Sequence, residues 1–279
     1  MKKSRLLFLM SALAVMAAMV LVACGDDDDD SGSSSGGDVS SELITAGTLT
    51  VGSDIPFPPF EFGKPPAYDG FDIDLTNEIA KDLELEVDIQ DTSFDTIFTD
   101  VAQGNFDMVA SASTITPERE QRVDFSDPYY EAEQALLVPE GSDVASVEDL
   151  SGLTVGAQDG TTGEAYANDE TDAGSVRGFP QGPAAIAAVR NGQVDATIID
   201  QPVAQDAVDK GQAGFEIVTT IPTNELYGLA FAQDTPALLE AVNESLASMK
   251  EDGRLDDLYQ KWFKIDAPDG VINGTHTPE

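Results

Sequence analysis

The chain repeats one order of apolar, glycine and acidic residues in its two halves, and this repeat restricts the fold more than any other feature. An apolar run between glycines, residues 47–52, returns as residues 152–156. In both halves a helical spacing of apolar residues leads to a glycine, and an apolar residue and an aspartate follow it, at residues 104–107 and 192–195. Strands that alternate with helices predict α/β lobes with largely parallel sheets. Two lobes of like construction predict a ligand between them, at the carboxyl ends of the strands.

The charge of the chain excludes some classes of partner. Its 279 residues carry 14 Lys and Arg against 52 Asp and Glu, a formal net charge of −38. A negative field of this size repels nucleic acids and anionic lipids, so we expect no nucleic-acid partner. The same acid excess fits a salty habitat, where counterions screen the self-repulsion. The hydrophobic content of 41% is that of a globular protein, and the length suffices for one large domain or two modest ones.

The first 23 residues have the order of an export signal. Three basic residues precede an apolar run over residues 6–22, which is short for a membrane-spanning helix. The run ends in Leu-Val-Ala-Cys, which resembles a bacterial lipobox, and Cys24 is the only cysteine, so an internal disulfide is excluded. We therefore predict a signal peptide over residues 1–23 and a lipid on Cys24 that anchors the protein to the outer face of the cytoplasmic membrane. A plain signal peptide with an incidental cysteine is the alternative. Residues 24–43, with many Gly, Ser and Asp, are the predicted acidic linker.

A basic residue follows the strand that we predict at residues 106–110. Small and hydroxylic residues come directly after that strand, and Thr116 with Pro117 predicts a helix start, with Thr at the N-cap. Arg119 lies on the first turn of that helix. A guanidinium fork beside hydroxyl groups at the carboxyl end of a strand suits bidentate capture of a carboxylate. In the alternative interpretation, Thr116 only caps the helix and Arg119 pairs with a surface acid.

The same stretch carries the pattern T-x-T-x-E-R, followed by V-D-F-S-D-P-Y-Y up to residue 130. This order resembles the signature of the polar-amino-acid substrate-binding proteins of ABC importers, family 3 of the bacterial solute receptors. The likeness covers about residues 44–265, and its further motifs lie at residues 54–62, 70–75, 152–163, 192–202 and 251–263.

The resemblance implies a two-lobed α/β fold like that of the type II periplasmic binding proteins, with a ligand cleft between lobes that two hinge crossovers join. We expect residues 44–135 and 230–265 to form the first lobe, and residues 136–229 to form the second. Residues 266–279, which are rich in Gly, Pro and polar side chains, are predicted to be a disordered tail.

The resemblance also assigns ligand contacts at the two ends of an amino-acid backbone. Arg119 is expected to hold the α-carboxylate of the ligand. The hydroxyl of Thr114 and groups of Ser111 and Ala112 are expected to add hydrogen bonds. Asp200 follows an apolar strand and is expected to bind the α-ammonium group; the alternative is that it caps the helix that starts at the next residue.

Two threonines precede a predicted helix in the second half. Thr161 and Glu164 have the spacing of a capping box, which is a sufficient structural reason for the threonine. The start of a helix also offers free N–H groups and the positive end of a dipole to a carboxylate. The resemblance makes Thr161 and Thr162 ligand contacts from the second lobe.

Four residues are assigned to the ligand side chain. The resemblance places Phe57 as an aromatic that stacks on it and Phe94 as a second apolar wall, whereas composition alone would put both in the core. Asp54 and Gln158 are expected to contact the polar end. An acidic ligand would bring a second carboxylate against Asp54. We therefore predict a polar neutral or basic amino acid, such as glutamine or arginine.

These expectations together predict an extracytoplasmic receptor that binds an L-amino acid and delivers it to an ABC permease, as a monomer and without cofactor or metal. We expect it not to be an enzyme. Two alternatives stay open. One is an enzyme like the cyclohexadienyl dehydratase branch of the family; the only histidine, His276, lies in the tail, but carboxylates are plentiful as acids or bases. The other is a sensory receptor that docks to a signalling partner.

Overall fold

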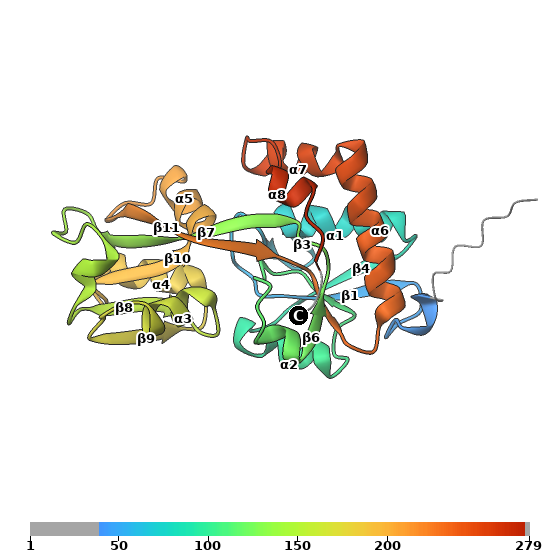
Figure 1. The fold of residues 1–279 in the computed structure, drawn as a ribbon, viewed down its shortest axis with the longest axis horizontal. Coiled ribbons are helices and arrows are strands. Elements are labelled where there is room, and N and C mark those ends of the chain that lie inside the picture. The colour runs from blue at the N-terminus through green and yellow to red at the C-terminus, as the bar shows by residue number, and fades with distance from the viewer. Residues whose placement is uncertain (1–38, 277–279) are drawn as a thin grey trace, which may run out of the picture. The chain divides into compact units, whose positions relative to one another are not determined.

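The computed structural model describes residues 39–276, and these form two five-stranded sheets flanked by helices, with a short two-stranded sheet beside them (Figure 1). The two large sheets define two lobes, which confirms the predicted two-lobed α/β architecture. The first lobe is built on the sheet that contains β1 (Thr48–Ser53), and the second on the sheet that contains β8 (Thr154–Gln158). The predicted signal peptide, Cys24 and residues 25–38 of the linker lie outside the described residues.

The sheet of the first lobe has the strand order β4-β1-β5-β12-β6. β1 is parallel to both of its neighbours, whereas β12 lies antiparallel between β5 and β6. β1 is buried along almost its whole length, as is typical of a parallel strand that helices cover on both faces. The remaining strands of this lobe are β2 Phe62–Lys64, β3 Ala67–Asp69, β4 Glu86–Asp91, β5 Met108–Val109, β6 Val123–Phe125 and β12 Ala230–Ala232.

The helices of the first lobe form where apolar residues recur with helical spacing. In α1 (Phe71–Asp82), Leu75 and Ile79 are buried, as their spacing predicts. α6 (Pro236–Asp252) ends at Gly253, whose φ of 87° turns the chain directly into α7 (Arg254–Trp262). The other helical elements here are η1 Val39–Ser41, α2 Phe94–Ala102, η2 Arg119–Gln121 and α8 Asp269–Ile272.

The sheet of the second lobe has the strand order β11-β7-β10-β8-β9. β8 lies between β9 and β10 and is parallel to both, and helices follow each of these three strands. The strands are β7 Tyr130–Pro139, β9 Ser175–Phe179, β10 Ala196–Asp200 and β11 Phe215–Tyr227; the helical elements are η3 Val147–Leu150, α3 Thr162–Asp169, α4 Gly182–Arg190 and α5 Gln201–Asp209.

Both sheets are mixed, so the expectation of largely parallel sheets is only partly right. β7 and β11 pair antiparallel from Phe215 opposite Pro139 to Tyr227 opposite Tyr130. These two long strands connect the lobes (Figure 1). One carries the chain out of the first lobe and the other carries it back, and therefore they run in opposite directions.

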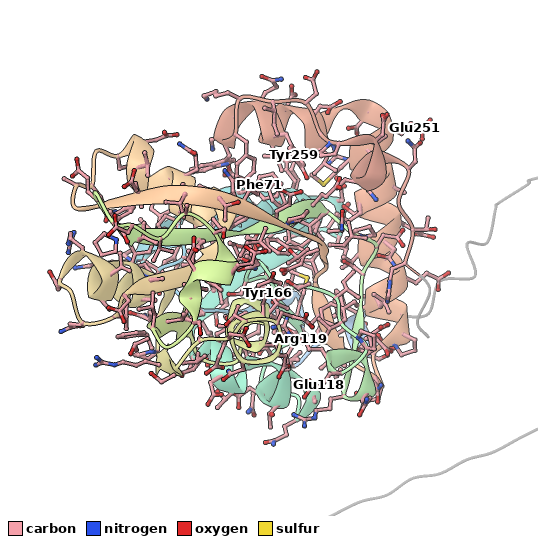
Figure 2. All side chains as sticks on the ribbon, turned by 60° about the vertical axis from the view of Figure 1, so that its left-hand side comes forward. Phe71, Glu118, Arg119, Tyr166, Glu251 and Tyr259 are labelled. Atoms are coloured by element: carbon pink, nitrogen blue, oxygen red, sulfur yellow. The ribbon has the colours of Figure 1, made fainter. Side chains whose placement is uncertain are left out.

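A cluster of aromatic rings forms the centre of the first lobe's core. Phe60, Tyr130 and Phe263 lie with ring centroids 4.8–5.6 Å apart. Phe71 packs edge-on against Tyr259 at 5.3 Å (Figure 2), so the start of α1 is fixed to α7. Phe263 also belongs to this cluster, since its ring contacts four of the other rings.

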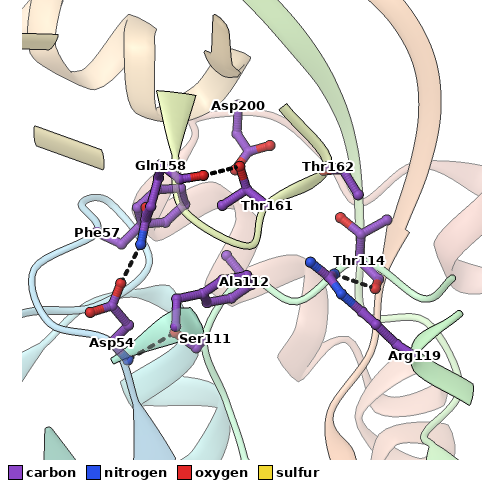
Figure 3. Close-up of a pocket in the computed structure, with 11 residues that line it drawn as sticks. Asp54, Phe57, Ser111, Ala112, Thr114, Arg119, Gln158, Thr161, Thr162 and Asp200 are labelled. Carbon is purple, nitrogen blue, oxygen red and sulfur yellow. Dashed lines mark hydrogen bonds between the residues drawn. The ribbon is translucent and has the colours of Figure 1, made fainter. Parts of the chain in front are cut away.

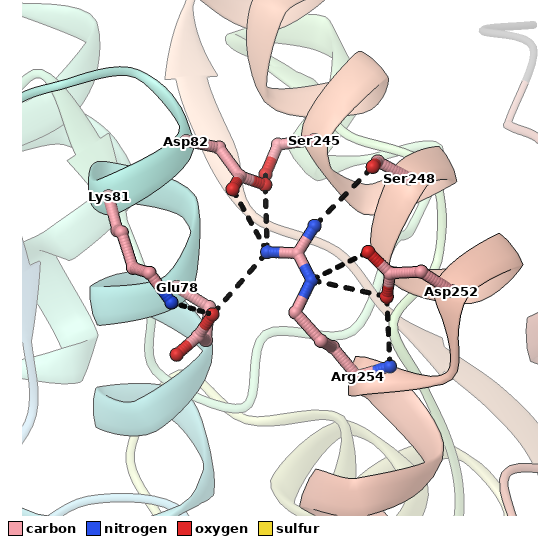
Figure 4. A network of polar contacts seen from close by, with 7 residues as sticks. All are labelled: Glu78, Lys81, Asp82, Ser245, Ser248, Asp252 and Arg254. Carbon is pink, nitrogen blue, oxygen red and sulfur yellow. Dashed lines mark hydrogen bonds and ion pairs between the residues drawn. The ribbon is translucent and has the colours of Figure 1, made fainter.

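An arginine network also joins α1 to α7 (Figure 4). Nη1 of Arg254 lies 2.9 Å from Oδ1 of Asp82 and 3.4 Å from Oε2 of Glu78, and Nε lies 2.9 Å from Oδ2 of Asp252. The Arg254 side chain is only 25% exposed, so solvent screens these pairs less than it screens a typical surface pair.

The prediction of a disordered tail is wrong for residues 266–276. α8 forms within it and buries Val271 completely, because this apolar residue packs against the first lobe's core. Farther along, the His276 backbone N–H donates to Oδ1 of Asp127 at 2.7 Å, and its ring Nε2 lies 2.8 Å from Oε1 of Glu120. Residues 277–279 lie outside the described part of the chain.

The helix predicted to start at Thr116 is shorter than expected. The Thr116 hydroxyl accepts from the Arg119 N–H at 3.2 Å, as a cap would, but only the 3₁₀ turn η2 follows. Strand β6 begins at Val123, so no room is left for a longer helix. None of the helices within residues 39–276 combines the length and the hydropathy that crossing a bilayer requires.

Candidate functional site

One pocket collects the residues that the sequence assigned to a site (Figure 3). Both lobes contribute to its wall. The lining residues are Asp54, Phe57, Phe94, Ser111, Ala112, Thr114, Arg119, Gln158, Thr161, Thr162 and Asp200. All eleven sequence-predicted contacts therefore lie around one space.

The loop after β5 brings backbone to the pocket. Ala112 has a φ of 43°, and its N–H donates to Oδ2 of Asp72 at 2.8 Å. The Ser111 hydroxyl accepts from the Asp54 N–H at 2.9 Å and donates to Oε1 of Glu61 at 2.8 Å. Two buried carboxylates, those of Asp72 and Glu61, thus accept hydrogen bonds from this loop.

Those supporting carboxylates, Glu61 and Asp72, are fully buried, and each keeps one oxygen without a hydrogen-bond partner within the described residues. Burial raises the pKa of Asp72 to about 6. Burial, together with the neighbouring Asp72 charge, raises the pKa of Glu61 well above its usual range. The loop after β5 is therefore hydrogen-bonded to two carboxyl groups whose pKa values are raised.

Arg119 is the basic residue among the eleven, and it faces both lobes. Its Nη1 donates to the Thr114 carbonyl at 2.7 Å, and its Nη2 to the Gly160 carbonyl at 3.1 Å. The guanidinium lies over the rings of Phe94 and Phe98, with centroid distances of 5.3 and 4.6 Å. Burial lowers its pKa to about 10, against the raising effect of nearby carboxylates, so the group stays charged at neutral pH. Of its five N–H donors, two are used in these contacts.

The second lobe contributes the start of α3. The Thr161 hydroxyl accepts from the Glu164 N–H at 3.2 Å and donates to the Gln158 carbonyl at 2.8 Å. The Glu164 carboxylate accepts from the Gly160 N–H at 2.8 Å, one residue before the position that a full capping box would use. The first backbone bond of this helix runs from the Ala165 N–H to the Thr161 carbonyl at 3.1 Å, so the N–H groups of Thr162 and Gly163 precede the helical ladder.

Asp200 ends β10 with its carboxylate in the pocket wall, and the residue is 8% exposed. It occupies the N-cap position of α5, but its side chain makes no cap hydrogen bond. The carboxylate instead accepts from Nε2 of Gln134. Burial and the nearby charge of Glu225 raise the pKa of Asp200 to about 8. A cation brought to this carboxylate would stabilise its charged form.

Asp54 and Gln158 meet across the two lobes. Nε2 of Gln158 donates to Oδ2 of Asp54 (Figure 3). Burial raises the pKa of Asp54 to about 7. Beside them, Phe57 lies so close to Gly182 of α4 that a Cβ there would come within 2.7 Å of its ring, so the glycine makes room for the aromatic wall.

Phe57 and Phe94 satisfy both interpretations of the sequence. Each lines the pocket, and each is also almost fully buried within a hydrophobic cluster.

Two residues that contact the pocket lining were not identified from the sequence, Glu225 and Gln134. Glu225 lies on β11 and is 7% exposed; its Oε1 accepts from Nε2 of Gln134 at 2.9 Å. Alternate residues of β11 are buried toward its end, so Glu225 shares the inward face with Tyr227. Within residues 39–276, His, Cys, Asp and Glu side chains form no group of three or more that could hold a metal ion.

Comparison with known proteins matches residues 49–265 to the model of the bacterial extracellular solute-binding proteins, family 3. The chain is 36% identical over 202 residues to the ABC transporter glutamine-binding protein GlnH of Bacillus subtilis (strain 168), covering 71% of this chain and 74% of that one. It is similar in structure to an ancestral arginine-binding protein bound to arginine, with a TM-score of 0.74, 40% identity, and coverage of 78% of this chain and 98% of that one.

A third similar structure is the ancestral amino-acid-binding protein AncCDT-1, a precursor of cyclohexadienyl dehydratase. The TM-score is 0.72 and the identity 40%, covering 78% of this chain and 96% of that one. These relatives share the two-lobed, type II periplasmic-binding-protein fold that the sequence predicted. The chain belongs to the bacterial extracellular solute-binding proteins, family 3.

Proposed function

We propose that this protein is an extracytoplasmic receptor that encloses one L-amino acid between its lobes and delivers it to the membrane subunits of an ABC permease. The observation that carries this proposal is the placement of a guanidinium and a carboxylate, Arg119 and Asp200, on the wall of one small pocket. A free amino acid presents a carboxylate and an ammonium group that match this pair. The glutamine- and arginine-binding relatives support the same class of ligand.

The charges suit a zwitterion better than a neutral solute. Arg119 keeps donors free beyond those given to the Thr114 and Gly160 carbonyls, and an ionised carboxylate can accept two of them in parallel. Burial keeps the Asp200 carboxyl mostly protonated at neutral pH, and an ammonium group would restore its charge. Hydrophobic contact alone would not select these two groups, because an unpaired buried charge costs several kcal/mol.

The far end of the pocket sets the preference for the side chain. Asp54 and Gln158 offer a carboxylate and an amide, with the Phe57 ring beside them. An acidic side chain would repel Asp54, whereas an amide or a guanidinium could replace the Asp54–Gln158 hydrogen bond. The proposed ligand is therefore a polar neutral or basic amino acid.

Delivery requires that the lobes part, and the paired strands β7 and β11 provide the hinge. A ligand that touches both lobes favours the closed state by its additional contacts there. We also propose that the mature chain acts as a monomer held at the membrane by a lipid on Cys24. Replacing Cys24 by Ser should release the protein from the cell surface if this anchor is correct.

Two observations favour a second candidate, an enzyme of the cyclohexadienyl dehydratase type. The chain is similar to AncCDT-1, a precursor of such an enzyme, and the pKa values of Asp54 and Asp200, about 7 and about 8, suit acid or base catalysis. Release of product from prephenate or arogenate would support this candidate; no turnover of either would count against it.

A thermal-melt screen against the twenty amino acids and prephenate tests the proposal. A ligand at a hundred times its dissociation constant adds about 2.7 kcal/mol of stability, which corresponds to roughly 5–10 °C for a protein of this size. A shift with one or two polar amino acids is expected. The screen should be repeated after unfolding and refolding, which removes ligand carried through purification; no shift with any amino acid after that step would overturn the proposed function.

A further inference from the structure

Glu225 connects the two lobes through hydroxyl groups that line the pocket. Its Oε2 accepts from the Thr114 hydroxyl at 2.6 Å and from the Thr162 hydroxyl at 2.7 Å. Thr114 belongs to the loop after β5 in the first lobe, and Thr162 begins α3 in the second. One carboxylate oxygen on the hinge strand β11 therefore receives a hydrogen bond from each lobe.

The hydrogen-bond donors around Glu225 fix the direction in which the two threonine hydroxyl protons point. Its two oxygens accept from the two threonines and from the Gln134 amide. Both threonine hydroxyls donate to Oε2, so both hydroxyl protons point at Glu225. A threonine hydroxyl has one proton and two lone pairs. The Thr162 oxygen also accepts from Nε2 of Gln134 at 3.5 Å, so it keeps one lone pair for the pocket, whereas the Thr114 oxygen keeps two.

Neither threonine hydroxyl can then donate to the carboxylate of a ligand. This differs from the expectation that the Thr114 hydroxyl supports Arg119 at the carboxylate end. Lone pairs attract a hydrogen-bond donor, and the Asp200 carboxylate lies in the same pocket wall and is bonded to the same Gln134 amide as Glu225. The arrangement therefore favours a positively charged donor at this end of the pocket.

We infer that Glu225 is a positioning residue: by taking the hydroxyl protons of Thr114 and Thr162, it makes both oxygens acceptors for the α-ammonium group of the ligand. The inference rests on the proposed amino-acid receptor function and adds a selection rule to it. The receptor distinguishes an α-amino acid from the same molecule without its ammonium group through Glu225, although Glu225 does not touch the ligand.

Two pairs of ligands isolate this effect. Each pair joins an amino acid to its analogue without the α-ammonium group: L-glutamine with glutaramate, and L-arginine with 5-guanidinopentanoate. Titration calorimetry on the full chain in detergent gives each dissociation constant. For Glu225→Gln we expect the affinity for the amino acid to fall by about tenfold or more, because a hydrogen bond to a charged group is lost. The affinity for the analogue should change by less than about twofold.

Two further variants exclude simpler explanations. Glu225→Asp keeps the charge but shortens the side chain, so its carboxylate should no longer reach both threonine hydroxyls. It should therefore lose the discrimination between amino acid and analogue, as Glu225→Gln does. If Glu225→Asp discriminates like the wild type, the effect is one of charge alone and the inference is overturned. Glu216→Gln removes the same charge from an exposed position on β11 and should change neither affinity. Equal losses for amino acid and analogue in Glu225→Gln would show a merely structural role and also overturn the inference.

A readout without ligand separates this inference from the proposed function. In threonine-labelled protein, the Thr114 and Thr162 hydroxyl protons should exchange slowly enough to be seen by NMR, and both should vanish in Glu225→Gln. Rapid exchange in the wild type would overturn the inference. If no amino acid binds in the melt screen, the proposed function fails and this readout still decides the role of Glu225. If Glu225→Gln does not fold, Thr162→Val takes its place, because it removes one of the two acceptor oxygens. This variant should lower the affinity for the amino acid but not the affinity for the analogue. An equal loss of affinity for both would overturn the inference.

Discussion

The guanidinium of Arg119 reaches from the first lobe to the second, where its Nη2 lies 3.1 Å from the carbonyl oxygen of Gly160. The same group lies over Phe94 and Phe98 and lines the pocket. One side chain therefore takes part in both ligand binding and the contact between lobes, and its replacement should affect both.

For Arg119→Ala we expect ligand affinity to fall by about 2–5 kcal/mol, because the ligand carboxylate loses its partner inside a desolvated pocket. Calorimetry with the amino acid found in the melt screen measures the loss. Arg122→Ala, which removes an exposed arginine three residues away, is the matched control and should bind like the wild type. Binding of Arg119→Ala within twofold of the wild type would contradict the assignment.

Ligand affinity should rise with pH between pH 6 and pH 8. The pKa of Asp200 is about 8 in the free protein, so its carboxyl is mostly protonated at pH 7, and an ammonium ligand must bind the ionised form. Binding therefore releases protons, and affinity increases by at most about tenfold per pH unit for one linked proton. Calorimetry at pH 7 in buffers of different ionisation enthalpy counts these protons. Asp200→Asn should remove most of the pH dependence, and a wild-type affinity that is constant over this range would rule out the linkage.

The stability of the free protein should change with pH in the opposite direction. A carboxyl whose pKa is higher in the folded than in the unfolded chain binds more protons when folded, so the free energy of unfolding falls as pH rises. For Asp54 and Asp200 the window runs from about pH 4 to their folded pKa values, about 7 and about 8. Denaturant unfolding at pH 5 and pH 8 measures the difference. The double variant Asp54→Asn with Asp200→Asn should lose less stability over this range than the wild type; an equal loss would show that these groups are not responsible.

Two neighbouring phenylalanines should respond differently to replacement by alanine. Phe60 is fully buried among aromatic rings, so Phe60→Ala should lower the free energy of unfolding by about 3–5 kcal/mol. Phe57 lines the pocket, so Phe57→Ala should lower the free energy of unfolding of the free protein less than Phe60→Ala does and should weaken ligand binding more. Chemical denaturation and calorimetry on both variants test this. If Phe57→Ala loses as much stability as Phe60→Ala and binds normally, then Phe57 is a core residue and not a ligand wall.

The network around Arg254 should matter for stability but not for binding (Figure 4). Arg254→Ala removes the partly buried connection between α1 and α7 and should lower the free energy of unfolding by about 1–2 kcal/mol, more than an exposed pair contributes. Lys81→Ala, whose side chain is 71% exposed, is the control and should change stability by less than about 0.5 kcal/mol. Equal effects of the two substitutions would show that Arg254 acts as an ordinary surface residue.

The residues that the sequence identified correctly are those that stand next to a recognisable local pattern. Arg119 follows a strand and a proline, Thr161 has a capping spacing, and Asp200 ends an apolar run, so each could be placed at the end of an element. The family likeness then brought these ends together. The pocket confirms that they lie around one space, while their contact with a ligand stays a prediction.

Glu225 could not be found in the same way, because its partners are distant in the chain. Its contact with Thr114 joins residues 111 positions apart, and Gln134 is 91 positions away. The pairing of β11 with β7 also shifts register between Ile221 and Glu225. A shift of this kind decides which side chains face inward, and the apolar pattern alone does not reveal it. The ordered tail was missed for a related reason, since only the three-dimensional core shows the place that Val271 fills.

The strand order of the first lobe has a consequence for how the molecule is assembled. β12 fills the place between β5 and β6, yet it is made only after all five strands of the second lobe, which occupy residues 130–227 without interruption. All strands of the second lobe thus precede β12 in the sequence, and the sheet of the first lobe cannot be completed without β12. During export, when the chain emerges from its amino end, the lobe that comes first in the sequence is the last to be finished.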